Sequence, residues 1–291
     1  MAVVETAPAK INLYLHVGPL RADGLHDLAS LFVFADVGDV ITARPASDLS
    51  LDVTGPFAGP LLGEDLSRNL VLRAARALRA ETGVEAGAAL TLDKRLPIAA
   101  GIGGGSADAA AALRALVRLW KVDLSDDALS RLAFRLGADV PACLAAAPVY
   151  VTGAGEIITT GPILPPLWVC LVNPLTPTPT GPIFRAFDSA NPNPPTPFLT
   201  RPASPDAAAF NFAMDASRND LEPHAVVRAP IVSDVISYLK SRPGARSARM
   251  SGSGATCFAL FSSREAATRA ARAARAFGWW SASARILSGR D

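Results

Sequence analysis

The spacing of apolar residues predicts the first elements of the chain. Apolar side chains occupy every second position from Ile11 to Val17, the pattern of a strand with one buried face. Over residues 69–81, leucines and alanines recur at helical spacing and arginines fill the outer positions, which predicts an amphipathic helix. Gly83 is expected to end that helix, because glycine readily adopts the left-handed conformation found after helix C-termini.

The same two spacings predict further elements. Strands are expected at residues 31–33, 40–43, 88–92, 167–172, 247–250 and 256–261, and helices at 107–120, 125–136, 220–227, 231–241 and 266–277. Gly38 and Asp39 are expected to break the chain between two of these strands, and Ser125 to cap a helix N-terminus. Helices and strands are mixed in both halves of the chain, which favours an α+β fold.

Proline and glycine punctuate the second half of the chain. Gly161-Pro162 and Pro165-Pro166 interrupt the pattern and predict two domains, residues 1–162 and 163–291. Ten of the 24 prolines fall between Pro174 and Pro205. That density predicts a long loop without regular structure.

Composition restricts the classes of function. The chain is 50% hydrophobic and 19% charged, enough apolar sequence for a substantial core. Its net charge of +2 and its scattered arginines form no basic stripe, so neither nucleic acid nor a membrane surface is an expected partner. The longest apolar run, residues 140–151, contains two prolines and is too short to span a bilayer, and no apolar signal segment is expected near the start. Three widely spaced cysteines favour reduced thiols in a cytoplasmic protein.

A glycine-rich segment carries the first chemical signal. Four glycines fall within the five positions 101–105, and an alanine-rich helical pattern follows directly. Glycines allow consecutive backbone N–H groups to converge, and a helix N-terminus adds further donors, so the segment predicts a site for a nucleotide phosphate. It lacks the Lys-Ser/Thr ending of a P-loop, and Ser106 or Asp108 replaces the last glycine of a dinucleotide fingerprint. The alternative is a turn whose glycines only allow close packing.

Four other short segments occur around this loop. They are Pro8-Ala9-Lys10, Arg21-Ala22-Asp23-Gly24-Leu25-His26, Gly137-Ala138-Asp139-Val140-Pro141 and Ser251-Gly252-Ser253-Gly254. In this order the segments resemble the GHMP kinase superfamily over the whole chain. The resemblance implies a two-domain kinase, with a ribosomal-S5-like N-terminal domain that binds ATP and a ferredoxin-like C-terminal domain that binds substrate. It also implies Mg²⁺ and transfer of the γ-phosphate of ATP to a hydroxyl group.

The resemblance assigns catalytic roles to Lys10 and Asp139. Asp139 is expected to act as the general base on the acceptor hydroxyl, and Lys10 to keep it ionised and to stabilise the developing alkoxide. Asp139 precedes a short helical pattern, so it also fits a helix N-cap. A lysine such as Lys10 is more commonly a solvated surface charge.

The resemblance assigns nucleotide binding to the glycine segment and two outlying residues. The expected contacts are Pro97, Ile98, Ala99, Ala100, Gly101, Ile102, Gly103, Gly104, Gly105, Ser106, Ala107, Asn69 and Lys94. Ser106 is also the candidate Mg²⁺ ligand, although it fits an N-cap of the following helix. Asn69 equally fits the start of a helix, and Lys94 equally fits a surface charge.

The segment from Arg21 to His26 is similar to that of superfamily members that phosphorylate a cytidine diphosphate substrate. The expected substrate contacts are Asn12, His26, Phe32, Thr180 and Phe184, with His26 reading the cytosine. The chain departs from that pattern at Leu25, where an aromatic residue usually stacks on the base, and at Ala99-Ala100, where glycines are common. His26 also fits an ordinary polar role, and Phe184 a place in the core.

Three other functions remain compatible with these patterns. One is a GHMP kinase for homoserine, mevalonate or a sugar, which the segment ending at His26 disfavours. Another is a nucleotide sensor without catalysis, which the presence of Lys10 and Asp139 disfavours. The third is an RNA-binding module, disfavoured by the absence of a basic stripe. A monomer or a weak homodimer is expected.

Overall fold

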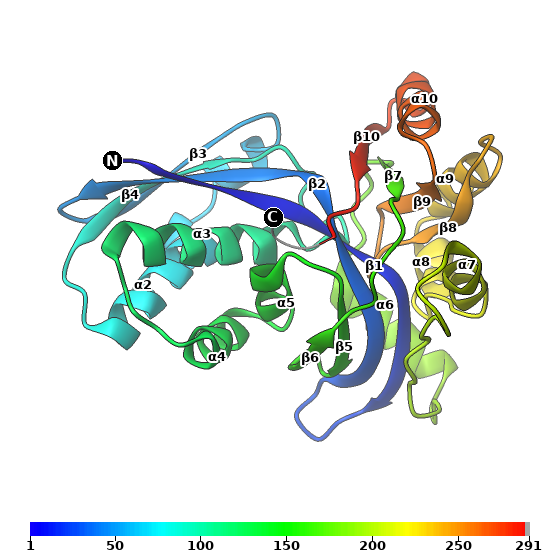
Figure 1. Cartoon of the computed structure of the whole chain (residues 1–291), viewed down its shortest axis with the longest axis horizontal. Coiled ribbons are helices and arrows are strands. Elements are labelled where there is room, and N and C mark those ends of the chain that lie inside the picture. Colours follow the sequence, from blue (N-terminus) through cyan, green and yellow to red (C-terminus); the bar gives the residue numbers. More distant parts are fainter. Residues whose placement is uncertain (289–291) are drawn as a thin grey trace. The chain divides into compact units, whose positions relative to one another are not determined.

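The computed structural model describes residues 1–288, and these residues form two compact units (Figure 1). Of the described residues, unit 1 contains 1–9, 38–98 and 103–145, and unit 2 contains 10–37, 99–102 and 146–288. Two long strands, β1 (Val3–Leu20) and β2 (His26–Ala46), contribute residues to both units. Helices and strands are mixed in each unit, which confirms the predicted α+β class. The boundary predicted between residues 162 and 163 stays a prediction.

Unit 1 packs helices against a sheet. β4 (Gly87–Asp93) pairs with β3 (Leu49–Thr54) in parallel and with residues 40–46 of β2 in antiparallel orientation. Figure 1 shows α2 to α5 gathered on one side of these strands. The helical elements of this unit are α1 (Gly59–Leu62), η1 (Leu66–Arg68), α2 (Leu70–Thr82), α3 (Gly104–Trp120), α4 (Asp126–Leu136) and α5 (Val140–Ala145). The buried alanines of α3 allow α2 and α5 to pack closely against it.

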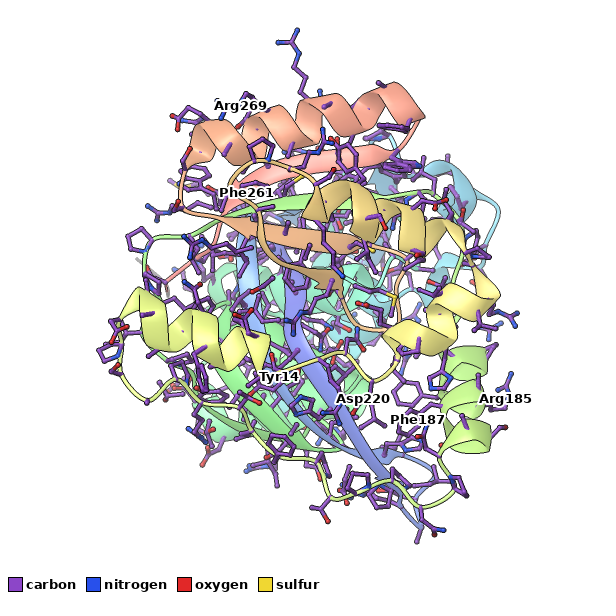
Figure 2. All side chains as sticks on the ribbon, turned by 90° about the vertical axis from the view of Figure 1, so that its right-hand side faces the viewer. Tyr14, Arg185, Phe187, Asp220, Phe261 and Arg269 are labelled. Atoms are coloured by element: carbon purple, nitrogen blue, oxygen red, sulfur yellow. The ribbon has the colours of Figure 1, made fainter. Side chains whose placement is uncertain are left out.

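Unit 2 contains a four-stranded antiparallel sheet of order β10-β7-β9-β8. Its strands are β7 (Trp168–Asn173), β8 (Arg246–Met250), β9 (Cys257–Phe261) and β10 (Trp280–Arg285). α9 (Ile231–Lys240) and α10 (Arg264–Ala274) pack on this sheet, and Figure 2 shows Phe261 of β9 beneath α10, which carries Arg269. Residues 28–32 of β2 pair with β5 (Val149–Gly153), which pairs with β6 (Ile157–Thr160). The remaining elements are α6 (Thr180–Ala190), α7 (Ala207–Asp215), α8 (Glu222–Arg228) and η2 (Arg275–Phe277).

The predicted break between residues 31–33 and 40–43 is wrong, since β2 runs without interruption through both segments. Gly38 is extended within it. A Cβ at Gly38 would lie 2.1 Å from the carbonyl oxygen of Ala7, so β1 passes too closely for any side chain. This glycine therefore reflects a close approach of two strands and no turn.

The prediction that residues 174–205 lack regular structure is also wrong, because α6 spans Thr180–Ala190. Its one proline, Pro182, lies in the first turn, where no intrahelical N–H bond is lost. The other nine prolines of the segment flank the helix. The sequence patterns predict no element at helix α7 or at four of the observed strands. These strands are β3, β5, β6 and β10.

Candidate active site

The glycine loop, residues 97–105, leads into α3. The helix begins at Gly104, three residues earlier than predicted, and its N-cap is Gly103 in the left-handed conformation (φ 63°). Ala107 N–H donates the first intrahelical bond, to Gly103 O at 2.8 Å. The N–H groups of residues 104–106 belong to the first turn, where a helix supplies no acceptors, and they share the positive end of the helix dipole. This geometry suits a phosphate group.

The middle of the glycine loop is bonded to other parts of unit 2. Lys10 N–H donates to Ile102 O at 3.0 Å, and Thr256 N–H donates to Ala100 O at 3.1 Å. A Cβ at Gly101 would lie 2.5 Å from the carbonyl oxygen of Ser251, so close packing alone requires glycine there. Gly105 is exposed and a Cβ would meet only ordinary contacts, so packing does not explain that glycine.

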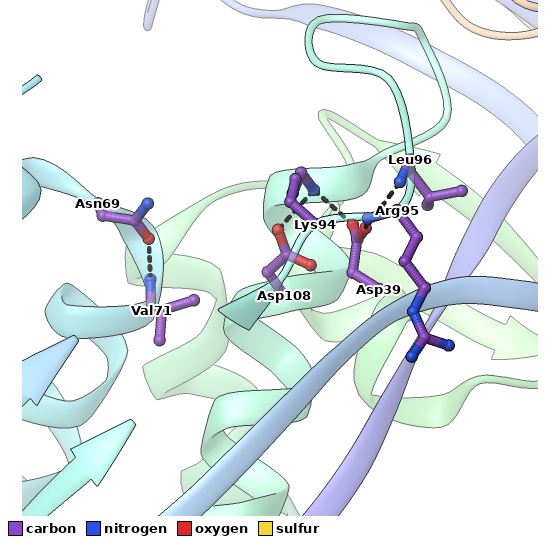
Figure 3. A network of polar contacts seen from close by, with 7 residues as sticks. All are labelled: Asp39, Asn69, Val71, Lys94, Arg95, Leu96 and Asp108. Atoms are coloured by element: carbon purple, nitrogen blue, oxygen red, sulfur yellow. Dashed lines mark hydrogen bonds and ion pairs between the residues drawn. The ribbon is translucent and has the colours of Figure 1, made fainter. Parts of the chain in front are cut away.

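Lys94 is buried in unit 1 and bonded to two buried carboxylates. Its Nζ lies 2.7 Å from Asp108 Oδ2 on α3 and is also paired with Asp39 Oδ2 on β2 (Figure 3). Asp39 Oδ1 accepts hydrogen bonds from the backbone N–H groups of Arg95 (2.6 Å) and Leu96 (2.8 Å). We call Asp39, Lys94 and Asp108 the Lys94 cluster. It joins both ends of the glycine loop, because residues 95–96 enter the loop and Asp108 follows it.

The charges of the Lys94 cluster depend on one another. Burial alone would lower the pKa of Lys94, but the carboxylates of Asp108 and Asp39 together raise it above its ordinary value. Burial raises the pKa of Asp108, Lys94 offsets part of that rise, and Asp39 adds to it. Lys94 is therefore no surface charge, and its ammonium group is already engaged within the protein. A Cβ at Gly104 would lie 3.1 Å from its Nζ, so the cluster lies directly beside the start of α3.

Asn69 and Ser106 occupy helix N-termini in unit 1. Asn69 is the N-cap of α2, where its Oδ1 accepts from Val71 N–H at 2.9 Å (Figure 3). The helix-start interpretation of Asn69 is confirmed, and a nucleotide contact would use its Nδ2 group. Ser106 is the third residue of α3 and no N-cap, so that alternative is wrong. Its half-buried side chain lies in the same turn as the N–H groups that suit a phosphate.

Lys10 and Asn12 form a buried polar pair on β1 in unit 2. Lys10 Nζ donates to Asn12 Oδ1 at 2.8 Å and lies 4.5 Å from the centre of the Phe32 ring. Asn12 Nδ2 donates to Ser30 Oγ at 3.1 Å, which fixes which end of the amide faces the lysine. Three of the predicted residues, Lys10, Asn12 and Phe32, are thus in contact, and the interpretation of Lys10 as a solvated charge is wrong.

The segment from Arg21 to His26 forms the predicted turn and a buried histidine. Arg21 N–H donates to Leu25 O at 2.7 Å across the turn, and Leu25 itself is 45% exposed. His26 is buried. Its Nδ1 donates to Gly18 O at 3.0 Å, because a carbonyl oxygen only accepts.

Phe184 and Thr180 belong to α6, also in unit 2. The Phe184 ring stacks on His26 with centroids 5.1 Å apart, and His26 Nε2 lies 3.2 Å from Asp188 Oδ1 on the same helix. Thr180 Oγ1 is 2.9 Å from Ser253 Oγ. The fold therefore brings His26 together with Phe184, although these residues are far apart in sequence.

Asp139 lies in unit 1, at the residue before α5. It is half-buried, and its carbonyl oxygen accepts from Cys143 N–H at 3.1 Å, as expected at the start of a helix. The predicted residues are divided between the units. Unit 1 holds Asp139, Asn69, Lys94, Pro97, Ile98 and residues 103–107, and unit 2 holds Lys10, Asn12, His26, Phe32, Thr180, Phe184 and residues 99–102.

Sequence reasoning missed the carboxylates that contact predicted residues. Asp39 and Asp108 bind Lys94, and Asp188 lies beside His26. The sequence does contain a signal for Asp108. An acidic residue within the alanine run 107–112 of a buried helix needs a partner. No group of three or more acidic, histidine or cysteine side chains suited to a metal occurs within residues 1–288.

Comparison with known proteins shows which family this chain belongs to. Residues 69–146 match the GHMP kinases N terminal domain and residues 202–278 match the GHMP kinases C terminal domain. A protein of Paramagnetospirillum magneticum named 4-diphosphocytidyl-2-C-methyl-D-erythritol kinase is 49% identical over 97% of this chain and 98% of its own length. The chain belongs to the GHMP kinase family. A protein of the same name from Cereibacter sphaeroides is 51% identical over 97% of this chain and 98% of its own length.

Solved structures agree with membership of the GHMP kinase family. A crystal structure of 4-(cytidine 5'-diphospho)-2C-methyl-D-erythritol kinase has a TM-score of 0.76 and 31% identity, and covers 99% of this chain and 100% of its own. Homoserine kinase from Cytophaga hutchinsonii has a TM-score of 0.72 at 18% identity, covering 100% of this chain and 96% of its own, and shares the fold. GHMP kinases use ATP as the phosphate donor. Within residues 1–288, no helix has both the length and the apolarity needed to cross a membrane.

Proposed function

We propose that this chain transfers the γ-phosphate of ATP to a hydroxyl group of 4-diphosphocytidyl-2-C-methyl-D-erythritol, a step of the methylerythritol phosphate route to isoprenoids. The observation that carries the proposal is the 49–51% identity, over 97% of the chain, to kinases of that name. The alternative is another small-molecule GHMP kinase. The homoserine and mevalonate kinase structures, at 18% and 10% identity, support the fold alone.

The glycine loop and the start of α3 are the proposed phosphate site, with Asn69 and Lys94 on the nucleotide side. Mg²⁺ commonly binds through one or two protein oxygens and the nucleotide phosphates, so a site without a cluster of acidic ligands fits this ion. Ser106 offers a hydroxyl oxygen in the first turn of α3, and it is the proposed ligand. When bound, Mg²⁺ would neutralise part of the phosphate charge.

Asp139 and Lys10 are proposed to act on the acceptor. The hydroxyl oxygen attacks the γ-phosphorus, the bond from that phosphorus to the bridging oxygen of ADP breaks, and the proton passes to the Asp139 carboxylate. Lys10 neutralises charge that develops on the attacking oxygen. Its bond to Asn12 and its place over the Phe32 ring hold the ammonium group in one position, which supports this role.

The cytidine end of the substrate is assigned to His26, Phe184 and Thr180. His26 is proposed to read one edge of the base. Its ring is buried and oriented by Gly18 O and Asp188. Leu25 is proposed to cover the base with apolar surface in place of an aromatic ring. We also propose the two domains at residues 1–162 and 163–291, a cytoplasmic location, and a monomer or weak homodimer without a nucleic-acid partner.

The test is an ADP-release assay with ATP, Mg²⁺ and a panel of acceptors. We expect turnover with the cytidine diphosphate substrate and none with homoserine or mevalonate. Asp139→Asn should lower kcat by about 10²–10⁴-fold and leave ATP affinity unchanged, because it removes the base alone. Asp127→Asn, on the exposed first turn of α4, is the matched control. Turnover with homoserine alone would establish the alternative, and normal turnover of Asp139→Asn would remove Asp139 from the mechanism.

A further inference from the structure

A five-residue segment of unit 2, Arg218 to Glu222, lies beside β1 and at the end of β8. Leu15 N–H donates to Arg218 O and Asp220 N–H donates to Leu15 O, both at 2.9 Å, so the segment pairs with β1 through a single parallel bridge at Asn219. Figure 2 shows Asp220 next to β1, the blue strand that also carries Tyr14. The sequence pattern predicts only the start of a helix here.

Asn219 bonds to two carbonyl groups of a different segment. Its buried Nδ2 donates to Met250 O at 2.9 Å and to Gly252 O at 2.8 Å, and its Oδ1 accepts from Leu221 N–H at 3.0 Å. The bond to Leu221 fixes the orientation of the amide, so one donor hydrogen points to the last residue of β8 and the other into the loop of residues 251–254. We call these residues the serine-glycine loop.

Two neighbours of Asn219 hold the same region. Glu222 Oε2 accepts from Met250 N–H at 2.8 Å, at the start of the serine-glycine loop. Asp220 Oδ2 accepts from Val17 N–H at 2.9 Å and thereby holds β1. Three side chains within four residues therefore satisfy backbone groups of two segments more than 200 positions apart in sequence.

The serine-glycine loop contacts residues assigned to both substrates. Ser251 Oγ accepts from Asn12 N–H at 3.1 Å and donates to Gly101 O at 3.0 Å. Asn12 is the partner of Lys10, and Gly101 lies in the glycine loop. A shift of the serine-glycine loop would therefore move Asn12 and Gly101 together.

We propose that Asn219 is a positioning residue for phosphoryl transfer, acting through the serine-glycine loop on Asn12 and Gly101. It touches neither the reacting oxygen nor the phosphate, and its effect is on the alignment of groups that do. The inference rests on the proposed function, since alignment matters only where a phosphoryl group is transferred. Misplacement of reacting groups by about 1 Å costs on the order of 10²-fold in rate, so an effect on kcat is the expected signature.

The test is Asn219→Asp, which keeps the size and the acceptor for Leu221 N–H but turns a carboxylate oxygen toward the carbonyls of Met250 and Gly252. We expect kcat to fall about 10–100-fold while the KM values for ATP and acceptor change less than about threefold. Asn219→Ser, which retains one donor, should give an intermediate loss and serves if the aspartate variant does not fold. The matched control is Asn191→Asp, because Asn191 Nδ2 donates to Phe187 O on α6, and its kcat should remain normal.

Each variant is assayed with its folded fraction measured by circular dichroism at the assay temperature. A fall in kcat at a constant folded fraction supports the inference. Normal kcat in Asn219→Ser and Asn219→Asp, or a fall that only follows the folded fraction, would overturn it. Failure of the proposed function looks different, because the parent itself would then be inactive with the cytidine acceptor. The same variants are then compared with whichever acceptor the parent phosphorylates.

Discussion

Lys94→Met isolates the contribution of the buried charges beside the glycine loop. Methionine retains most of the length of the lysine side chain and removes its charge. Lys94 is 3% exposed, and its partners Asp39 and Asp108 are 0% and 3% exposed, so water cannot replace the lost ammonium group. The variant leaves two carboxylates close together in the interior with no cation between them.

The expected loss of stability is large at high pH. Removing one partner of a buried ion pair costs about 3–5 kcal/mol, because the remaining charge is uncompensated. Burial already raises the pKa of Asp108, and removing Lys94 takes away the cation that lowers it, so in the variant this pKa rises further above that of the unfolded chain. A folded state that binds more protons loses stability as the pH rises, so the loss should reach this range near pH 8 and shrink toward pH 5.

The assay is urea unfolding followed by circular dichroism at pH 8 and pH 5. The control is Arg95→Met, because Arg95 pairs with Asp93 at an exposed position and should contribute less than about 1 kcal/mol. Adding Asp108→Asn to Lys94→Met removes one of the two charges and should restore part of the stability. A Lys94→Met protein within about 1 kcal/mol of the parent at pH 8 would refute the reasoning, as would a loss that does not depend on pH.

Three further predictions follow from other contacts. Gly101→Ala places a Cβ 2.5 Å from Ser251 O at a φ of +73°, so calorimetry should show weaker ATP binding, and unchanged affinity would contradict this. Burial lowers the pKa of His16, so as the pH falls below about 6.5 the unfolded chain takes up the proton first and stability is lost. Thermal melts of His16→Gln should therefore depend less on pH than those of the parent, and equal slopes would exclude His16. Leu25→Tyr should lower the acceptor KM by a modest factor, since an aromatic pair adds roughly 0.5–1.5 kcal/mol, with the ATP KM as the control.

Elements with local signals were predictable from the sequence. The limits of α2 followed from Asn69 and Gly83, which cap the helix with their own side chain or backbone and need no distant partner. The segments that indicated a GHMP kinase could also be found in the sequence, because each consists of consecutive residues. The prediction of a break at Gly38 was wrong, because glycine is required there by the close backbone of Ala7. A local sequence pattern does not contain that contact.

The contacts that organise the site were not predictable in this way. Lys94 meets a carboxylate 55 positions away, and Asn219 donates to carbonyls 31 and 33 positions ahead. Such pairs arise from tertiary packing, which spacing along one element does not encode. The sequence indicated which residue types the chemistry requires, whereas the structure identifies what orients them.

The division of the chain into two units has a consequence for its synthesis. Unit 1 is complete once residue 145 has left the ribosome, whereas unit 2 needs residues 10–37 together with residues up to β10, and Leu287 N–H bonds to Phe34 O. The apolar side chains of β1 that pack with later residues, such as Leu15 and Val17, must therefore wait for the second half of the chain, on the order of ten seconds at typical rates of translation. During this interval the nascent strand offers an unpaired edge, and chaperone capture of residues 10–37 would protect it from aggregation.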